Sequence, residues 1–211
     1  MANEIHNYPL EVYTIGDNDY FDVDYFTGLA YQTAKIKGIA INPGKFAMIS
    51  PSTNVTGTAE QSILDGTGVG SLSVPANGFN VGDSFRLTIR GYIGAHNNDT
   101  LIINIKVNGL VTLATSGPIT LPTITNKVFE IIVDFTINAI GGPMVGSVTL
   151  SGGIAYNKDS ANIYEGQDFL SVNNTSFDTT ILNTLDVTAQ YSSTNPANTI
   201  QSFIGILEKT R

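Results

Sequence analysis

The chain contains no cysteine among its 211 residues. Disulfides, thiolate nucleophiles and cysteine-type zinc sites are therefore excluded, and nothing in the sequence indicates a redox compartment. A folded state has to be stabilised by packing. Since 42% of the residues are hydrophobic, we expect most of the chain to be ordered.

Charged side chains are scarce, at 13% of the residues, and acidic residues outnumber basic ones by 18 to 10. The resulting net charge of -8 repels phosphate backbones, and no stripe of lysine or arginine offsets it. Nucleic acid is therefore excluded as a partner. The surface has to be made largely of Asn, Thr, Ser and Gly, which suits exposed strands and turns.

Long apolar runs are also missing, and so is a basic start followed by an apolar stretch. These absences predict a soluble chain that has no signal peptide and does not insert into a membrane. No window shows a sustained helical stripe with a capped start, which argues against a helical or βαβ architecture.

Alternation of apolar and polar residues, the pattern of a strand with one wet face, is the main positive signal. It is clear in DSFRLTIRGYIG, in LIINIKV and above all in NKVFEIIVDFTIN. The turn-like stretch AHNND predicts a hairpin between the first two of these strands. With about ten strands after residue 55, bounded by Gly, Pro, Asn or Asp, the sequence predicts an all-β, antiparallel, two-sheet sandwich or jelly roll.

The first fifty residues differ from the rest, because an acidic and aromatic stretch is followed by a weaker alternation. We interpret residues 1–50 as an N-terminal arm or attachment segment and residues 51–211 as the jelly-roll domain. The segment SPSTNVTGTAEQ is the best candidate for a boundary or hinge. The alternative is that the first segment adds a long edge strand to the main sheet.

No motif predicts a cofactor, and the metal candidates are weak. Asp17, Asp19, Asp22 and Asp24 offer oxygen ligands for calcium, but their spacing lacks the central glycine and final glutamate of an EF-hand. A solvated loop is the alternative. The two histidines, His6 and His96, lie in polar contexts, and the sequence assigns neither a Ser or Asp partner.

Some strands carry apolar residues on both faces, which is more than one sandwich core requires. Ile102 and Ile132 interrupt polar faces, and near the C-terminus Phe203 and Leu207 alternate with Ile200, Ile204 and Ile206. A strand buried on both sides lies between two layers, and the second layer can be a neighbouring subunit. We infer homo-oligomerisation, with terminal loops covering the face as the alternative. The candidate interface or core residues are Phe129, Ile131, Phe135, Phe203 and Ile204.

From about Gly57 onward the chain resembles the jelly-roll domain of phage tail or head fibre proteins and of structural proteins of large DNA viruses. The matching stretches are SLSVPANGFNVGDSFRLTIRGYIGAHNNDTLIINIKV, NKVFEIIVDFTINAIG and SVNNTSFDTTILNTLDVTAQY. The resemblance covers about three quarters of the chain and rests on strand order and turn phrases. It implies a homotrimer of tumour-necrosis-factor-like or C1q-like jelly rolls on a virion, used for attachment or capsid decoration.

Three functional hypotheses follow. The first is a non-enzymatic viral structural or host-interaction protein that assembles as a homotrimer, with other virion proteins, a host receptor or a glycan as further partners. The second is a lectin-like module that binds glycans through the loops GAHNNDT and SVNNTSF. The third is a polysaccharide-degrading enzyme using Glu130 with Asp134 or Asp186. Because residues four apart on a strand lie about 13 Å apart, the pair Glu130 and Asp134 exceeds the usual catalytic separation.

Overall fold

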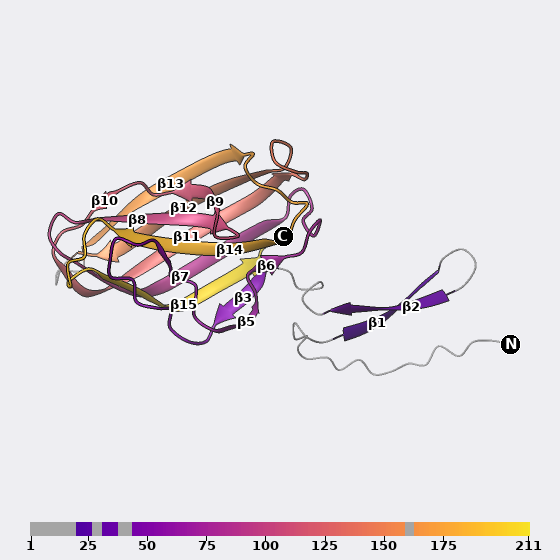
Figure 1. Cartoon of the computed structure of the whole chain (residues 1–211), viewed down its shortest axis with the longest axis horizontal. Coiled ribbons are helices and arrows are strands. Elements are labelled where there is room, and N and C mark those ends of the chain that lie inside the picture. The colour runs from indigo at the N-terminus through magenta and orange to yellow at the C-terminus, as the bar shows by residue number, and fades with distance from the viewer. Residues whose placement is uncertain (1–19, 27–30, 38–43, 159–162) are drawn as a thin grey trace.

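The structure, a computed structural model, describes residues 20–26, 31–37, 44–158 and 163–211. The described residues form fifteen strands and no helix, so the all-β prediction is confirmed. Every strand pairing is antiparallel. Figure 1 shows two sheets packed face to face, as the sequence predicted for a sandwich.

The larger sheet has seven strands in the order β13-β12-β11-β7-β15-β3-β5 (Figure 1). Their bounds in that order are Tyr164–Asn174, Ser147–Asn157, Ile124–Ala139, Ser84–Ala95, Thr199–Lys209, Lys45–Met48 and Gly68–Ser71. The strand β3 precedes the predicted domain boundary at residue 51, and it pairs with β15 and β5. The division into an arm and a domain stays a prediction, but the seven-stranded sheet begins at Lys45.

The smaller sheet has six strands, with β8 and β14 at its centre. One side of β8 pairs with β9 and β10, and one side of β14 pairs with β4 and β6. The bounds are Gln61–Ser62 for β4, Ser73–Val74 for β6, Thr100–Val107 for β8, Val111–Thr115 for β9, Ile119–Thr120 for β10 and Asn183–Tyr191 for β14. The strands β1, Tyr20–Phe26, and β2, Tyr31–Lys37, form a separate two-stranded sheet.

The long strands cross between the two sheets along the chain, except that β11, β12 and β13 follow one another within the seven-stranded sheet. β7 lies in the seven-stranded sheet, β8 in the six-stranded sheet, β11 in the former, β14 in the latter and β15 in the former again. The predicted hairpin between the strands flanking AHNND is therefore wrong, since these residues carry the chain from one sheet to the other. Alternation within a strand determines which side chains face the core, but it does not determine which strand is the neighbour.

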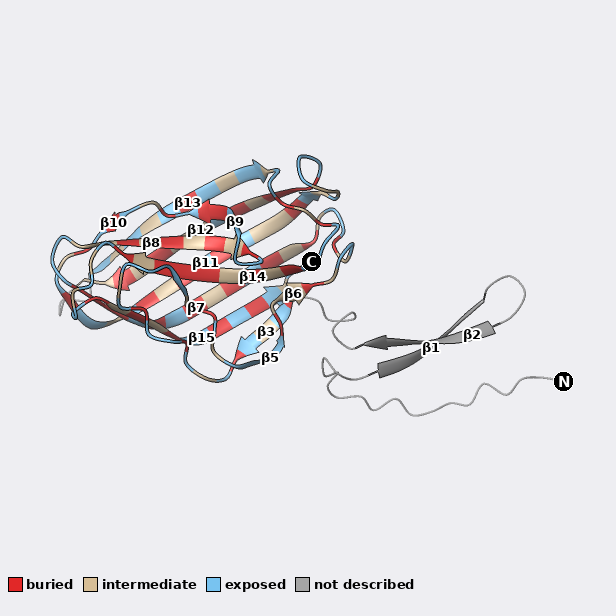
Figure 2. Ribbon diagram, viewed as in Figure 1, coloured by how far each residue is buried: buried red, intermediate tan, exposed pale blue. Residues whose placement is uncertain are grey.

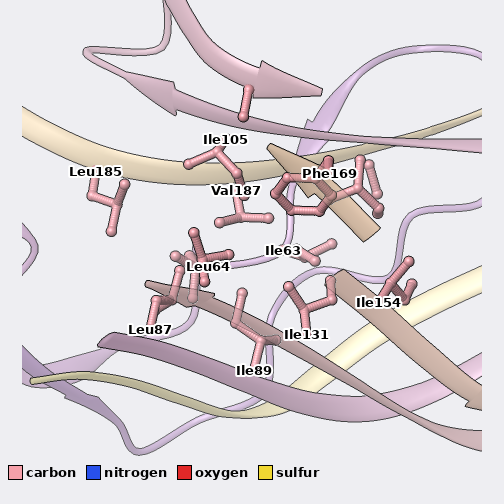
Figure 3. Close-up of a cluster of buried hydrophobic side chains, with 14 of the residues drawn as sticks. Ile63, Leu64, Leu87, Ile89, Ile105, Ile131, Ile154, Phe169, Leu185 and Val187 are labelled. Atoms are coloured by element: carbon pink, nitrogen blue, oxygen red, sulfur yellow. The ribbon is translucent and has the colours of Figure 1, made fainter. Parts of the chain in front are cut away.

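The core lies between the inner faces of the two sheets. Leu87, Ile89 and Ile131 of the seven-stranded sheet meet Ile105 and Val187 of the six-stranded sheet (Figure 3), and all five are fully buried. Burial alternates along the strands, as Figure 2 shows. The apolar stripes predicted for residues 85–93, 101–107 and 129–137 accordingly face the core, with Phe135 alone only partly buried.

The segment predicted to be a boundary or hinge is bonded to both sheets. Val55 exchanges backbone hydrogen bonds with Ile200 of β15, at 3.0 Å in each direction, and it is fully buried. Within the same segment, the Gly57 carbonyl accepts a hydrogen bond from Tyr191 N of β14 at 3.0 Å. The segment therefore connects the two sheets along one edge of the sandwich. Its small polar residues suit a path along that edge.

Tyr191 closes one end of the core with its hydroxyl. This side chain is 1% exposed, and its Oη donates to the carbonyls of Gly94 at 2.9 Å and Thr199 at 2.8 Å. The contact joins β14 to the ends of β7 and β15, so one side chain ties the two sheets together. Burial raises the pKa of this phenol.

We expect Tyr191→Phe to lower the free energy of unfolding by about 1–2 kcal/mol, because the single hydroxyl proton shared between the carbonyls of Gly94 and Thr199 is lost while the ring packing is kept. Urea unfolding measures this change, with Tyr164→Phe as the control because Tyr164 is exposed. Equal midpoints for the two variants would contradict a role for the hydroxyl in joining the sheets.

Candidate assembly face

The outer face of the seven-stranded sheet carries a concentration of exposed apolar side chains. We call this surface the apolar sheet face. Its large members, all classed as exposed, are Val69, Tyr92, Val128, Ile132, Leu170, Phe203, Ile204 and Ile206. A monomer rarely exposes so many large apolar side chains on one contiguous surface without a partner.

Strand register aligns the centre of this face into one row across the sheet. The row runs Val69, Ala47, Ile206, Thr88, Ile132, Gly153 and Asp168, each paired with the next on the neighbouring strand. Five of these seven residues are apolar or have no side chain. The row therefore forms a surface of low polarity across the width of the sheet.

A β-bulge in β15 enlarges the apolar sheet face. The register shifts between Ser202, which pairs with Gly91, and Ile204, which pairs with Arg90. The extra residue is Phe203, and both Phe203 and Ile204 are exposed as a result, at 43% and 42%. The simple alternation predicted from sequence, with Phe203 opposed to Ile204, is therefore wrong, because a bulge reverses the parity of every later residue.

The bulged side chain packs against its neighbour on β7. The rings of Phe203 and Tyr92 are edge to face, with centroids 5.5 Å apart. Beyond the bulge, Leu207 faces the core together with Ile200, although sequence parity placed them on opposite faces. The bulge thus moves one aromatic ring outward while the core stays filled.

The two arginines on this face are each paired with a carboxylate of the neighbouring strand. Arg86 binds Asp134 through two hydrogen bonds, Nε to Oδ1 at 2.7 Å and Nη2 to Oδ2 at 3.0 Å. Arg90 Nε donates to Glu130 Oε1 at 2.6 Å, and this pair lies on the other side of the central row from Arg86 and Asp134. A partner can therefore cover this surface without leaving either arginine unpaired, which is the costly outcome when charges are buried.

A trough of about 540 Å³ lies on the face above β12. Its floor is made of the small residues Ser151, Gly153 and Ala155. Residues on β11 form one wall, and residues on β13, including Leu170, form the other. The trough gives the apolar sheet face a concave part into which a protruding side chain can pack.

The structure separates the five residues predicted to lie in the core or interface. Phe129 and Ile131 are fully buried in the core, whereas Phe203 and Ile204 lie on the apolar sheet face. Phe135 is half-buried and stacks on Phe85, with ring centroids 5.1 Å apart. Sequence alone does not make this distinction, because core and interface strands share the same period.

The outer face of the six-stranded sheet is polar by contrast. Glu60 gathers a network there: its carboxylate accepts hydrogen bonds from Asn104, Lys106 and Thr188. These contacts, the one from Thr188 foremost, lower the pKa of Glu60. Sequence reasoning missed this cluster, since Glu60 lies more than forty residues from each partner.

We expect the Glu60 network to make stability depend on pH. A lowered folded-state pKa contributes stability above the unfolded value of 4.5, and this contribution is lost as the pH falls through the folded-state pKa. The difference in unfolding free energy between the natural chain and Glu60→Gln should therefore be largest at about pH 7 and shrink at about pH 3. Urea unfolding at both pH values tests this, and a constant difference would contradict it.

The carboxylates proposed for polysaccharide cleavage are not arranged as a catalytic pair. Glu130 and Asp134 each bind an arginine on the apolar sheet face. Asp186 lies on β14 in the other sheet and accepts a hydrogen bond from Ser62 Oγ at 2.5 Å. Burial raises the pKa of Asp186. The predicted pairing of Glu130 with Asp186 is therefore wrong, because the core separates the outer faces of the two sheets.

The two loops proposed for glycan contacts lie at opposite ends of the sandwich. GAHNNDT follows the end of β7, where Ala95 pairs with Ile124. SVNNTSF lies at the end of β13, where Asn174 pairs with Val148, and Val148 pairs in turn with Ile137. Thirteen residues of β11 separate Ile124 from Ile137, a length of about 43 Å. One glycan site built from both loops is therefore excluded.

A histidine, an aspartate and a serine meet at one of these ends. His96 Nδ1 lies 3.6 Å from Asp99 Oδ2, and Asp99 accepts hydrogen bonds from Ser193 Oγ and Asn198 Nδ2. The hydrogen bond from Ser193, followed by that from Asn198, lowers the pKa of Asp99. The serine donates to the carboxylate rather than to the imidazole, which is the opposite of a nucleophilic triad. The cluster fixes two loops together, and His6 lies outside the described residues.

The predicted calcium ligands are only partly described. Asp17 and Asp19 lie outside the described residues, while Asp22 and Asp24 lie on β1, where they pair with Lys35 and Thr33 in the backbone register. Over the described ranges, no group of three or more His, Cys, Asp or Glu side chains is close enough to hold a metal ion. Calcium binding by the complete cluster stays a prediction.

In the described part of the chain there is no helix of the length and hydrophobicity needed to cross a membrane. A comparison with protein-family models found no match, and comparisons with curated proteins and with solved structures found none either. Function is therefore inferred from the geometry of the chain itself.

Proposed function

We propose that the chain is a non-enzymatic assembly protein that forms a homotrimer through the apolar sheet face. One observation carries this proposal: large apolar side chains, aligned by strand register and accompanied by fully paired arginines, cover the outer surface of one sheet and not of the other. We take a second copy of the chain as the partner, because another copy is present in every preparation of the protein.

The dimensions of the face support an interface of ordinary size. Seven strands spaced about 4.8 Å apart span about 29 Å, and the twelve residues of β7 span about 37 Å. The product is on the order of 1,000 Å², compared with about 800 Å² per partner in a typical stable interface. The face therefore has room for a permanent contact.

The strand order supports a jelly roll of the tumour-necrosis-factor or C1q kind as the architecture of each subunit. The chain crosses from one sheet to the other between β7 and β8, between β10 and β11, between β13 and β14 and between β14 and β15. In such a fold, neighbours within a sheet are distant in sequence, as β7 and β15 are here. The strands β12 and β13 extend the edge of the seven-stranded sheet beyond β11.

A viral structural or host-interaction role follows from the resemblance of residues 57–211 to fibre and virion jelly rolls. In this role the trimer decorates a virion or attaches it to a host, and its further partners are other virion proteins, a host receptor or a glycan. The abundance of Thr, Ser and Asn and the absence of disulfides agree with such a domain.

Sedimentation equilibrium of the full chain at micromolar concentration tests the proposal. The expected result is a species with three times the chain mass of 22.5 kDa. A stable monomer at that concentration would overturn the assembly, and a stable dimer would overturn the trimer.

A further inference from the structure

The two halves of the apolar sheet face differ in shape. β7 is the middle strand of the seven-stranded sheet, with β12 two strands to one side and β3 two strands to the other (Figure 1). The half around β12 is hollowed by the trough. The half around β15 and β3 bears the exposed side chains of Phe203, Ile204 and Ile206. One half can therefore receive a side chain that the other half supplies.

The trough has a negative charge without a counter-charge. Three carboxylates line it, those of Glu130, Asp134 and Asp168. Glu130 is paired with Arg90, and Asp134 is paired with Arg86. Asp168 is exposed, and no ion pair between described residues includes it. A cation that enters the trough therefore finds one free carboxylate.

The carboxylate of Asp168 lies over the floor of the trough. Asp168 pairs with Gly153 in the strand register, and a Cβ at Gly153 would lie 2.5 Å from Asp168 Oδ1. The exposed side chains of Ile132 and Leu170 belong to the two walls. This combination suits a long side chain with an apolar stem and a cationic end, because the stem can pack on the walls while the charge meets Asp168.

The other half of the face carries such a side chain. Lys45 begins β3 and is exposed, and it lies on the same side of the strand as Ala47 of the central row. Phe46, between them, packs against the core. Lys45 and Glu208 line the same surface hollow, but among the described residues Lys45 is in no ion pair. Lys45 is thus a cation on the apolar sheet face that is available to a partner.

A closed trimer brings the two halves together. In a ring of identical subunits, each copy offers a different surface to each of its two neighbours. If the threefold axis runs along the middle strand, β7, strands at equal offsets meet, and β3 of one copy faces β12 of the next. Lys45 lies two residues along the strand from the central row that contains Asp168, a displacement of about 7 Å. The flexible four-carbon stem of a lysine covers this displacement.

We propose that Lys45 of each copy inserts into the trough of the next copy and binds Asp168 there. The inference rests on the proposed trimer and specifies the contact within it, which joins the β3 half of one face to the β12 half of its neighbour. The ammonium and the carboxylate neutralise each other, so neither charge is covered without a partner.

Carbodiimide cross-linking of the natural chain tests this contact, because the reagent joins an amine directly to a carboxylate that touches it. Within one chain, β3 and β13 are five strand spacings apart, about 24 Å, which is too far for a direct link. We expect an amide between Lys45 and Asp168 of different copies, located by fragmentation mass spectrometry and absent from Asp168→Asn. A trimer in which Lys45 is joined only to Glu208, or to no carboxylate, would overturn the contact.

Charge reversal provides a second test. We expect Asp168→Lys and Lys45→Asp each to raise the dissociation constant of the trimer at least about tenfold, because each leaves an unpaired charge at the interface. With both changes in one chain, opposite charges meet again, and the constant should return to within about threefold of the natural value. Sedimentation over a concentration series measures these constants. Lys127→Asp is the control for Lys45→Asp, since Lys127 pairs in register with the buried Ile93, away from the apolar sheet face.

The possible outcomes distinguish this inference from the proposed function. A natural chain that sediments as a monomer overturns the homotrimer and the contact with it. A natural trimer that both single variants leave unchanged overturns the contact of Lys45 with Asp168 alone, and so does a double variant that associates as weakly as the single variants.

Discussion

Replacing Ile206 by lysine is expected to convert the proposed trimer into a monomer of 22.5 kDa. Ile206 lies in the central row of the apolar sheet face, between Ala47 and Thr88 in the strand register. A lysine there places an unpaired ammonium group at the centre of the interface. Central interface residues commonly contribute more than about 2 kcal/mol, so we expect subunit affinity to fall at least about thirtyfold.

The matched control is Thr112→Lys on β9. Thr112 is also an exposed strand residue, but it belongs to the six-stranded sheet. Sedimentation of both variants at equal concentrations should give a monomer for Ile206→Lys and an unchanged mass for Thr112→Lys. If both variants keep the mass of the natural chain, the apolar sheet face is not the interface.

The fold class and most core residues could be predicted from the sequence because period-two alternation reports which side chains are buried. Leu87, Ile103 and Val133 were placed in the core in this way, and all are fully buried. The pairing of strands could not be predicted. One of the two partners of β7 is β15, more than one hundred residues away, and no local pattern encodes that contact.

The candidate site was predictable only as an excess of apolar residues. Ile132 and Ile204 were identified as surplus to one core, and both are exposed on the outer face of the seven-stranded sheet. The bulge that turns Phe203 outward left no signal, because an inserted residue looks like any other in an apolar run.

The largest change in folding stability is expected from Phe129→Ala. Phe129 is 1% exposed in the centre of β11, and removing its ring leaves a cavity between the sheets. Such truncations cost about 3–5 kcal/mol, a large part of the stability of an ordinary domain. Urea unfolding at low protein concentration measures this loss without the contribution of subunit association.

Phe203→Ala also removes a phenylalanine ring from a strand of the seven-stranded sheet. We expect it to act on subunit association rather than on folding. In the monomer Phe203 is 43% exposed, and the edge-to-face contact with Tyr92 that it loses costs about 0.5–1.5 kcal/mol. Subunit association should weaken more than folding, and the apparent stability should therefore become dependent on protein concentration. If Phe203→Ala instead lowered monomer stability as much as Phe129→Ala, the bulge would be part of the core. The sequence does not distinguish Phe129 from Phe203. Their positions on the inner and outer faces of the seven-stranded sheet predict a role in folding for Phe129 and a role in assembly for Phe203.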